Sequence, residues 1–339
     1  MSEALYRKYR PQKFSDCLGQ DHIVKVLEAE TKSGDISHAY LFAGTRGIGK
    51  TSVARIFAKA IGTSQNDIVE IDAASNTGID DIRALNDSVQ TLPFDSKYKV
   101  YILDEVHMLS KSAANALLKT LEEPPKHVVF ILATTELHKI PDTVMSRCQF
   151  FTFKKPSQEV LKKMLIDVVK KEGYSIDQAS AELMALLGDG SFRDTLGIAQ
   201  KVLAYSKNKI ISEDEVRLVT GAPTISLVHS FISSIANKNL ISGLESVKEA
   251  VNQNVDMSVF LKLVLHTARA VLLFRFGAGH IVKNELSKEE VNFVESLSTK
   301  DSPFSSAVLV ELLSAYEAIK TAYIPSLPIE LALINIIGK

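Results

Sequence analysis

The sequence predicts an α/β domain with a parallel five-stranded sheet, followed by a small helical domain and then an all-helical domain. Three observations support this fold class. Short apolar runs alternate with helical segments in the first 155 residues, no clear strand follows residue 157, and the last third shows only helical periodicity. Strands that alternate with helices indicate a parallel sheet covered on both faces.

The five predicted strands are rich in β-branched and aromatic residues and have the usual length of a strand. They lie at 39–43, 67–71, 99–103, 128–133 and 149–153. The segments TSVARIFAKAI and SAANALLKTLEE between them have the apolar spacing of amphipathic helices. After residue 157 we expect three helical stretches up to residue 220, and amphipathic helices from there on. The predicted domains are 1–155, 156–221 and 222–339.

The composition is that of an ordinary globular chain. Its 339 residues are 46% hydrophobic and 23% charged, and the formal net charge is −1, so nucleic acid would have to be bound by a local face. The charged start MSEALYRKYR does not resemble a signal peptide. The apolar run VFLKLVLHTARAVLLFRF is interrupted by basic residues and predicts a buried helix rather than a membrane span. Cys17 and Cys148 are far apart, which argues against a disulfide framework or a cysteine zinc site and favours a cytoplasmic protein.

The stretch GTRGIGKT follows the first predicted strand and opens a predicted helix, as a phosphate-binding loop does. Its glycines let backbone N–H groups turn toward phosphate oxygens, and the helix N-terminus adds a partial positive charge. The candidate nucleotide-binding residues are Gly44, Thr45, Arg46, Gly47, Ile48, Gly49, Lys50 and Thr51. We expect Lys50, on an open loop, to reach the β and γ phosphates, and the Thr51 hydroxyl to bind Mg²⁺.

The strand VYILDEVH ends in two acids, which predicts the catalytic edge of the sheet. Asp104 would hold the magnesium, and Glu105 would act as the general base toward the attacking water. Thr135 ends the next strand and could contact the γ-phosphate or that water, since ligands of open α/β sheets sit at the carboxyl ends of strands. For Thr135 a plain strand-end hydroxyl is the alternative. His107 is expected to make hydrogen bonds behind the site.

Two arginines stand where a cation needs an explanation. Arg193 begins a helix in the middle domain and could reach the phosphates, or it could pair with Asp189 or Asp194. Arg147 lies just before an apolar strand and next to Cys148. A structural arginine paired with a local acid is one interpretation of Arg147.

These motifs together resemble the bacterial DNA polymerase III clamp-loader ATPases, the tau/gamma subunits of the AAA+ family. The resemblance covers residues 4–220. It is carried by KYRPQKFSDCLGQ, HAYLFAGTRGIGKTS, EIDAASNTGIDDIR, VYILDEVHMLSKSAANALLKTLEEPP, FILATTELHKIP and SRC.

The resemblance implies an AAA+ ATPase domain, a helical lid and a collar that mediates oligomerisation. It implies ATP and Mg²⁺ as ligands, and as partners the delta and delta-prime subunits, further copies of this chain, the sliding clamp and primed DNA. Thr135 and Arg193 would be the two sensors, and Arg147 of the SRC motif a finger that acts in trans on the ATP of a neighbouring subunit. The segment around the adenine would contain Tyr9, Arg10, Pro11 and Leu18, next to Gly19 and Gln20.

The sequence departs from the family pattern in two places. The usual four-cysteine zinc module is missing, because AKAIGTSQNDIVEID runs directly from the loop helix into the next strand, so we expect no zinc. The turn AASNTGIDD lacks the basic residues that the family often has there. Arg83, Lys111 and Thr143 remain as candidate DNA contacts.

Three other interpretations stay open. The first is a delta-prime-like stator that does not hydrolyse ATP, against which the intact Lys50, Thr51 and Glu105 argue. The second is an AAA+ motor for DNA branch migration, which would need a winged DNA-binding domain rather than helices at 222–339. The third is a pure scaffold. Whether the chain is part of a longer tau-type protein cannot be read from these residues.

Overall fold

The computed structural model describes residues 3–75, 77–299 and 302–338, and the chain folds as two compact units. The first unit consists of residues 1–168 and 188–200, and the second of residues 169–187 and 201–339. The segment 156–221 is therefore shared between the two units, and the three domain boundaries expected from the sequence stay a prediction.

The first unit is built on the predicted five-stranded sheet, which is confirmed. Its strands are β1 (Ala39–Ala43), β2 (Ile68–Asp72), β3 (Lys99–Asp104), β4 (Val128–Thr134) and β5 (Gln149–Thr152). All pairings are parallel, and the strand order is β2-β3-β4-β1-β5. The central strands β1 and β4 are buried along their whole length because helices cover both faces of the sheet.

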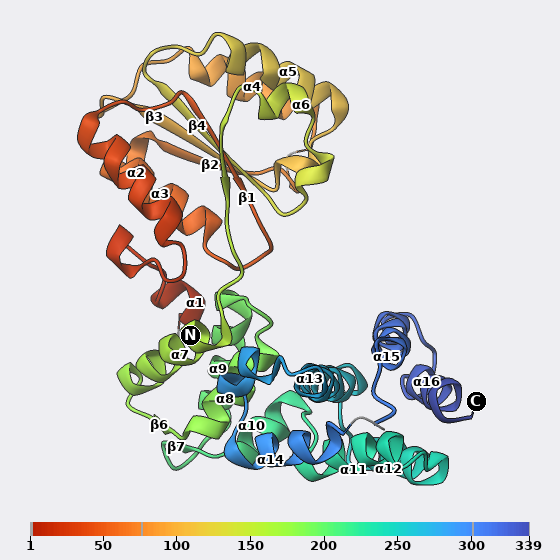
Figure 1. Ribbon diagram of the computed structural model, residues 1–339. Coiled ribbons are helices and arrows are strands. Elements are labelled where there is room, and N and C mark those ends of the chain that lie inside the picture. Colours follow the sequence, from red (N-terminus) through yellow and green to blue (C-terminus); the bar gives the residue numbers. More distant parts are fainter. Residues whose placement is uncertain (1–2, 76, 300–301, 339) are drawn as a thin grey trace. The chain divides into compact units, whose positions relative to one another are not determined.

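Two groups of helices cover the sheet, one on each face (Figure 1). The helices of this unit are α1 (Leu5–Lys8), α2 (Asp21–Ser33), α3 (Lys50–Ala60), α4 (Ile79–Val89), α5 (Lys111–Glu122) and α6 (Asp142–Met145), with most of α7 (Gln158–Lys171) and the start of α9 (Phe192–Tyr205). Side chains of α2 and α3 pack on Tyr40 and Phe42, and side chains of α4 and α5 pack on Leu41 and Phe130. The alternation of side chains along each strand thus supplies two separate cores.

The second unit is almost entirely helical. Its helices are α8 (Gln178–Leu187), α10 (Glu213–Thr220), α11 (Ile225–Ala236), α12 (Leu240–Asn252), α13 (Met257–Arg275), α14 (Lys288–Leu297), α15 (Ser306–Ile319) and α16 (Leu327–Ile337). The middle of the chain contains four helices (α7 to α10), one more than expected. It also contains a parallel pair of two-residue strands, β6 (Ser175–Ile176) and β7 (Ile210–Ile211), where we expected no strand. Strands of two residues are too short to show a periodicity in the sequence.

Helix α13 has the length and composition of a membrane-crossing helix, with a mean hydropathy of 1.6 over its most apolar window. Core helices of globular proteins share these properties. In this chain Phe260, Leu261, Val264 and Val271 of α13 are buried in the core of the second unit, together with residues of α11 and α15. The buried helix expected from the sequence is what the structure shows.

Candidate functional site

The loop between β1 and α3 has the backbone of a phosphate cradle. Gly47 and Gly49 have φ angles of +75° and +105°, in the left-handed region that favours glycine. A Cβ at Gly44 would come within 2.7 Å of Ile48 Cδ1, and a Cβ at Gly47 within 2.1 Å of Ser191 Oγ. The Gly47 carbonyl also accepts a hydrogen bond from the Phe192 N–H at 2.9 Å. The glycines are therefore required by the fold of the loop as well as by any ligand.

The N-terminus of α3 offers donors to an anion. Helix α3 begins at Lys50, after Gly49 in the left-handed conformation. In the part of the chain that the structure describes, the N–H groups of Gly49, Lys50 and Thr51 donate no hydrogen bond. Free N–H groups in the first turn of a helix, together with the helix dipole, favour phosphate.

Lys50 is buried, in contrast to the exposed lysine expected from an open loop. Its side chain is folded against the loop, where Nζ donates to the carbonyls of Gly44 at 2.7 Å and Thr45 at 3.0 Å. Burial lowers the pKa of Lys50, and the carboxylates of Glu105 and Asp104 act in the opposite direction. Phosphate oxygens would therefore compete with these two carbonyls for the hydrogen bonds of the ammonium.

Thr51 and Asp104 form the candidate magnesium site. The Thr51 hydroxyl donates to Asp104 Oδ2 at 2.6 Å, although the two residues are 53 positions apart in the chain. The other carboxylate oxygen, Oδ1, accepts from the Glu105 N–H at 3.0 Å. A hydroxyl and a carboxylate are the oxygen donors that Mg²⁺ prefers, so this pair fits the ion.

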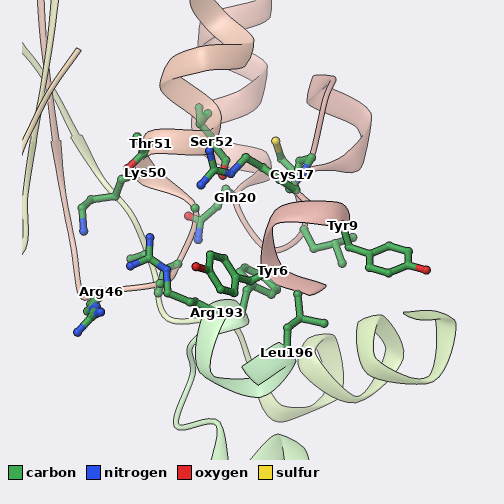
Figure 2. A pocket seen from close by; sticks show the side chains of 18 of the residues that line it. Tyr6, Tyr9, Cys17, Gln20, Arg46, Lys50, Thr51, Ser52, Arg193 and Leu196 are labelled. Carbon is green, nitrogen blue, oxygen red and sulfur yellow. The ribbon is translucent and has the colours of Figure 1, made fainter. Parts of the chain in front are cut away.

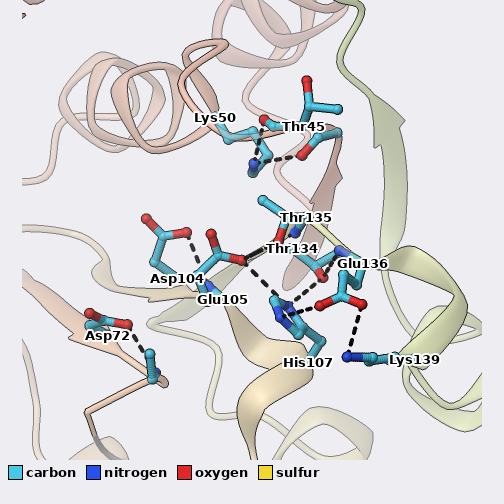
Figure 3. Close-up of polar contacts among 12 residues, drawn as sticks. Thr45, Lys50, Asp72, Asp104, Glu105, His107, Thr134, Thr135, Glu136 and Lys139 are labelled. Carbon is cyan, nitrogen blue, oxygen red and sulfur yellow. Dashed lines mark hydrogen bonds and ion pairs between the residues drawn. The ribbon is translucent and has the colours of Figure 1, made fainter. Parts of the chain in front are cut away.

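Glu105 is held in an unusual conformation at the end of β3. Its φ of 51° lies in the left-handed region, which is rare for a residue with a side chain and costs about 1–3 kcal/mol. Its Oε2 accepts from the Thr135 hydroxyl at 2.8 Å and from the Thr135 N–H at 3.2 Å (Figure 3). Thr135 therefore contacts the candidate base directly, which distinguishes it from a plain strand-end hydroxyl.

His107 lies behind this pair, as its place in the sequence suggests. Its ring is almost fully buried; Nδ1 lies 3.1 Å from Thr134 Oγ1 and 3.4 Å from Glu105 Oε2, and Nε2 lies 3.3 Å from Glu136 Oε1 (Figure 3). Glu136 in turn pairs with Lys139 at 2.8 Å. His107 thus joins the ends of β3 and β4 and supports Glu105 from the side.

A pocket in the first unit joins these groups to the N-terminal segment, and its empty space, open mouth included, is about 1040 Å³. Of the segment expected around an adenine, Tyr9, Arg10, Pro11 and Leu18 line it, whereas Gly19 is not among its lining residues. Asp104, Glu105 and Arg193 also line it. Further lining residues that the sequence did not single out are Tyr6, Asp16, Cys17, Ser52, Val53, Met164, Phe192 and Leu196. Tyr6 and Leu196 (Figure 2) come from α1 and α9, and Met164 comes from α7, so no local motif could have grouped them. Gln20 also lines the pocket. Its side-chain Nε2 donates to the Lys154 carbonyl, and its Oε1 accepts from the Lys154 N–H.

The pocket wall has four basic side chains (Arg10, Arg46, Lys50 and Arg193) and three acidic ones (Asp16, Asp104 and Glu105). Burial lowers the pKa of the Arg10 guanidinium, Arg55 and Arg193 lower it further, and Glu70 raises it. Arg193 lies over the ring of Tyr6, with 5.7 Å between the guanidinium carbon and the ring centroid (Figure 2). Among the described residues Arg193 forms no ion pair with Asp189 or Asp194, the alternative considered above, and Asp189 lies 3.8 Å from Lys155. An anion in the pocket would relieve the repulsion among these arginines.

Arg147 lies away from this pocket and pairs with a local acid. Its Nη1 donates to the Thr143 carbonyl at 2.7 Å and to Ser146 Oγ at 3.2 Å, and its Nη2 contacts Glu122 Oε1 at 2.5 Å. The ion pair is half-exposed. Within a single chain Arg147 thus pairs with a local acid, as the structural interpretation expects. A role in trans would require a neighbouring subunit.

The three candidate DNA contacts are exposed and come from three different helices. Arg83 on α4 pairs with Asp80 at 3.0 Å, Lys111 is the first residue of α5, and Thr143 lies on α6 with its carbonyl bonded to Arg147. Asn76, in the turn that precedes α4, lies outside the described residues.

The two cysteines lie on opposite faces of the sheet. Cys17 packs beside the core under α2 and α3, and Cys148 beside the core under α4 and α5. Burial raises the pKa of each thiol to about 12, with a smaller contribution from Asp16 at Cys17. Within the described residues no group of three or more His, Cys, Asp or Glu side chains is arranged to hold a metal.

Comparison with known proteins groups the chain with subunits of the bacterial replicase. The sequence matches the family described as DNA polymerase III, delta subunit, over residues 19–74 and 62–157. It is 41% identical over 298 residues to the DNA polymerase III subunit tau of Bacillus subtilis, covering 82% of this chain and 53% of the relative. It is 37% identical over 318 residues to the same subunit of Escherichia coli, covering 88% and 49%. The chain thus spans about half the length of these relatives.

Solved structures confirm the fold class. The Thermotoga maritima RuvB Holliday junction branch migration motor superimposes with a TM-score of 0.54 over 67% of this chain and 79% of that chain, at 22% sequence identity. The chain thus shares the fold of this motor over two thirds of its length, with a five-stranded parallel sheet followed by helical structure. At this identity the likeness concerns the fold alone.

Proposed function

Because the chain belongs to the family of bacterial DNA polymerase III tau/gamma subunits, we propose that it is an ATPase subunit of the replicative clamp loader. In this role it uses ATP binding and hydrolysis to open a sliding clamp and load it on primed DNA. The observation that carries the proposal is the convergence of the loop, Lys50, the Thr51–Asp104 pair and Glu105 at the carboxyl edge of the sheet.

The residues divide the chemistry between them. The N–H groups at the start of α3 and the Lys50 ammonium bind the phosphates, and Thr51 and Asp104 would hold Mg²⁺. When bound there, magnesium supplies charge neutralisation on the phosphates. Glu105 accepts the proton of the attacking water, and Thr135 and His107 orient its carboxylate. Arg193 contacts the phosphates from the same chain, and Tyr9, Arg10, Pro11 and Leu18 surround the base.

Arg147 acts in trans in this proposal. Its distance from its own pocket supports this, since the residues that line the pocket do not include it. A neighbouring subunit would receive the guanidinium at its γ-phosphate, where a planar fork of donors stabilises the developing charge. The expected partners are further copies of this chain, the delta and delta-prime subunits, the clamp and primed DNA, and Arg83, Lys111 and Thr143 are proposed DNA contacts. A cytoplasmic location and a collar at 222–339 go with this assignment.

Three rival functions fit the observations less well. A delta-prime-like stator shares the matched family description, but it would not need the complete set of Lys50, Thr51, Asp104 and Glu105. A branch-migration motor shares the fold at 22% identity, whereas the tau relatives are 37–41% identical. A scaffold would need neither the loop nor the acids.

An ATPase assay distinguishes these functions. The chain is measured alone, with delta and delta-prime subunits, and with clamp and primed DNA added. A clamp-loader ATPase shows turnover that rises on assembly and again with clamp and primed DNA. A stator shows no turnover in any mixture, and a branch-migration motor responds to four-way junctions rather than to primed DNA.

The missing cysteine module leads to a separate proposal, that the chain binds no stoichiometric zinc. Cys17 and Cys148 face different cores and have no thiol neighbour in the described residues. Elemental analysis of the purified chain measures this directly. About one zinc per chain would contradict the proposal.

A further inference from the structure

The guanidinium of Arg147 is fixed by three contacts that differ in origin. Thr143 and Ser146 lie four and one positions before Arg147, on or just after the short helix α6. Glu122 lies 25 positions before it, as the last residue of α5. Contacts to Thr143 and Ser146 move with Arg147 when its segment moves. Within the described residues, Glu122 is the side chain that ties this guanidinium to a separate element of the fold.

Helix α5 is a rigid reference for such a tie. Its Leu117 and Leu121 are buried in the core against the sheet, and Ser110 caps its start by accepting from the Ala113 N–H. Helix α6 has four residues, and Val144 is its buried residue. A side chain at the end of α5 therefore has a better-defined position than one on the segment that carries Arg147.

The contacts leave part of the guanidinium open. Arginine has five N–H donors, and the three contacts use two on Nη1 and one on Nη2. About a third of the Arg147 side chain is exposed, as is half of Glu122. Arg147 can thus keep its ties and still present donors to a group outside the chain.

We propose that Glu122 is a positioning residue for Arg147, one that holds the guanidinium in the orientation in which it meets the phosphate of a neighbouring subunit's nucleotide. This inference rests on the proposed role of Arg147 in trans. An arginine on a flexible side chain must lose its rotational freedom before it can stabilise a transition state. Glu122 removes that freedom in advance, as preorganised donors do in other active sites.

The neighbouring acid provides a matched control. Glu123 is the exposed residue directly after the last residue of the same helix, and in the described part of the chain its side chain makes no hydrogen bond or ion pair. Glu122→Ala and Glu123→Ala therefore remove the same group from the same helix end. Glu122→Gln keeps an oxygen that can accept from Nη2 and removes only the charge.

The experiment uses the assembled complex with its partner subunits, clamp and primed DNA. Steady-state kinetics give kcat and KM for ATP in complexes that contain each variant. Glu122→Ala is expected to lower kcat on the order of 10-fold with little change in KM, because a misoriented arginine costs transition-state stabilisation. Glu122→Gln should retain most of the activity, and Glu123→Ala all of it. The melting temperature of the isolated chain should change little in all three, since both acids are at the surface.

Arg147→Ala and the double variant Arg147→Ala/Glu122→Ala separate the possible failures. If Glu122 acts through Arg147, the double variant is no slower than Arg147→Ala alone. If Arg147→Ala has no effect on hydrolysis, the role in trans fails and this inference falls with it. If Arg147→Ala slows hydrolysis and Glu122→Ala does not, this inference alone is wrong. A faster reaction in Glu122→Ala would also overturn it, because the pair would then restrain Arg147.

Discussion

The first unit has charged groups in two settings, the nucleotide pocket and the surface around Arg147, here called the edge. The two regions differ in how deeply these groups are buried and in what holds them. In the pocket, the buried Lys50 is held by the carbonyls of its own loop, and the half-buried Thr51 pairs with Asp104 from a distant part of the chain. At the edge, Arg147 is partly exposed and paired with the exposed Glu122. A buried charge without a partner is costly, so the fold itself keeps the pocket groups in place. An exposed ion pair is worth about 1 kcal/mol or less, so the pair at the edge can orient Arg147 but adds little to the stability of the fold.

The largest expected effect is the loss of hydrolysis rate when Arg147 at the edge is replaced. Arg147→Ala should leave the nucleotide affinity of its own chain nearly unchanged and slow hydrolysis at the adjacent subunit by about 10³–10⁵-fold, the usual worth of an arginine finger. Lysine should not restore the rate fully, since it lacks the planar fork. The measurement is single-turnover hydrolysis in assembled complexes.

Mixing two variants shows where Arg147 acts. Arg147→Ala chains mixed with Glu105→Gln chains can place an intact arginine against an intact glutamate at some interfaces. Hydrolysis should therefore recover in part, while each variant alone stays slow. Mixtures that co-assemble without any recovery would mean that Arg147 serves its own subunit or only the fold.

The next effect concerns the base in the pocket. Glu105→Gln should retain ATP binding and lower hydrolysis by about 10²–10⁴-fold, because an amide cannot accept the proton. The amide oxygen can still accept from Thr135, so the conformation of the loop should persist. Binding is followed by fluorescence titration and turnover by phosphate release. Normal turnover would show that another group activates the water.

Lys50 tests the phosphate loop itself. Lys50→Ala should weaken ATP binding by about 10²-fold or more, since charged hydrogen bonds of ~1.5–3 kcal/mol each are lost. Lys50 also holds the carbonyls of Gly44 and Thr45, so Lys50→Met, which keeps the apolar stem, is the better control for loop packing. Unchanged affinity in both variants, measured by nucleotide titration, would contradict the assignment of the loop.

The smallest expected effect is a difference between the two regions in how nucleotide changes the alkylation rate of their cysteines. Cys17 lines the pocket and Cys148 is next to Arg147, and both thiols have a pKa raised to about 12 by burial. Because the thiolate is the reactive form, alkylation at pH 8 should be on the order of 10³-fold slower than for a free cysteine. Nucleotide should slow the reaction at Cys17 several-fold further and leave Cys148 unchanged.

Single-cysteine variants make this comparison measurable. Cys148→Ser reports on the pocket and Cys17→Ser on the edge, each by mass spectrometry of the alkylated chain. Equal protection of both cysteines by nucleotide would place the ligand elsewhere or indicate a change in the whole unit.

The sequence by itself determined the sheet and the chemistry-bearing edge. Strand positions were predicted to within about one residue, because buried parallel strands are short, continuous apolar runs with helices between them. Lys50, Thr51, Asp104 and Glu105 could be named from motifs in which a few neighbouring residues serve one ligand.

The tertiary structure decided what depends on distant elements. The pocket wall from Tyr6, Met164 and Leu196 joins three helices, and the Glu105 carboxylate is bonded by Thr135, which lies just after β4. The burial of Lys50 and the pairing of Arg147 with Glu122 likewise leave no local pattern, since a surface acid at a helix end is common in any sequence. Local spacing records which groups serve one ligand, whereas burial and long-range pairing arise only when the elements pack.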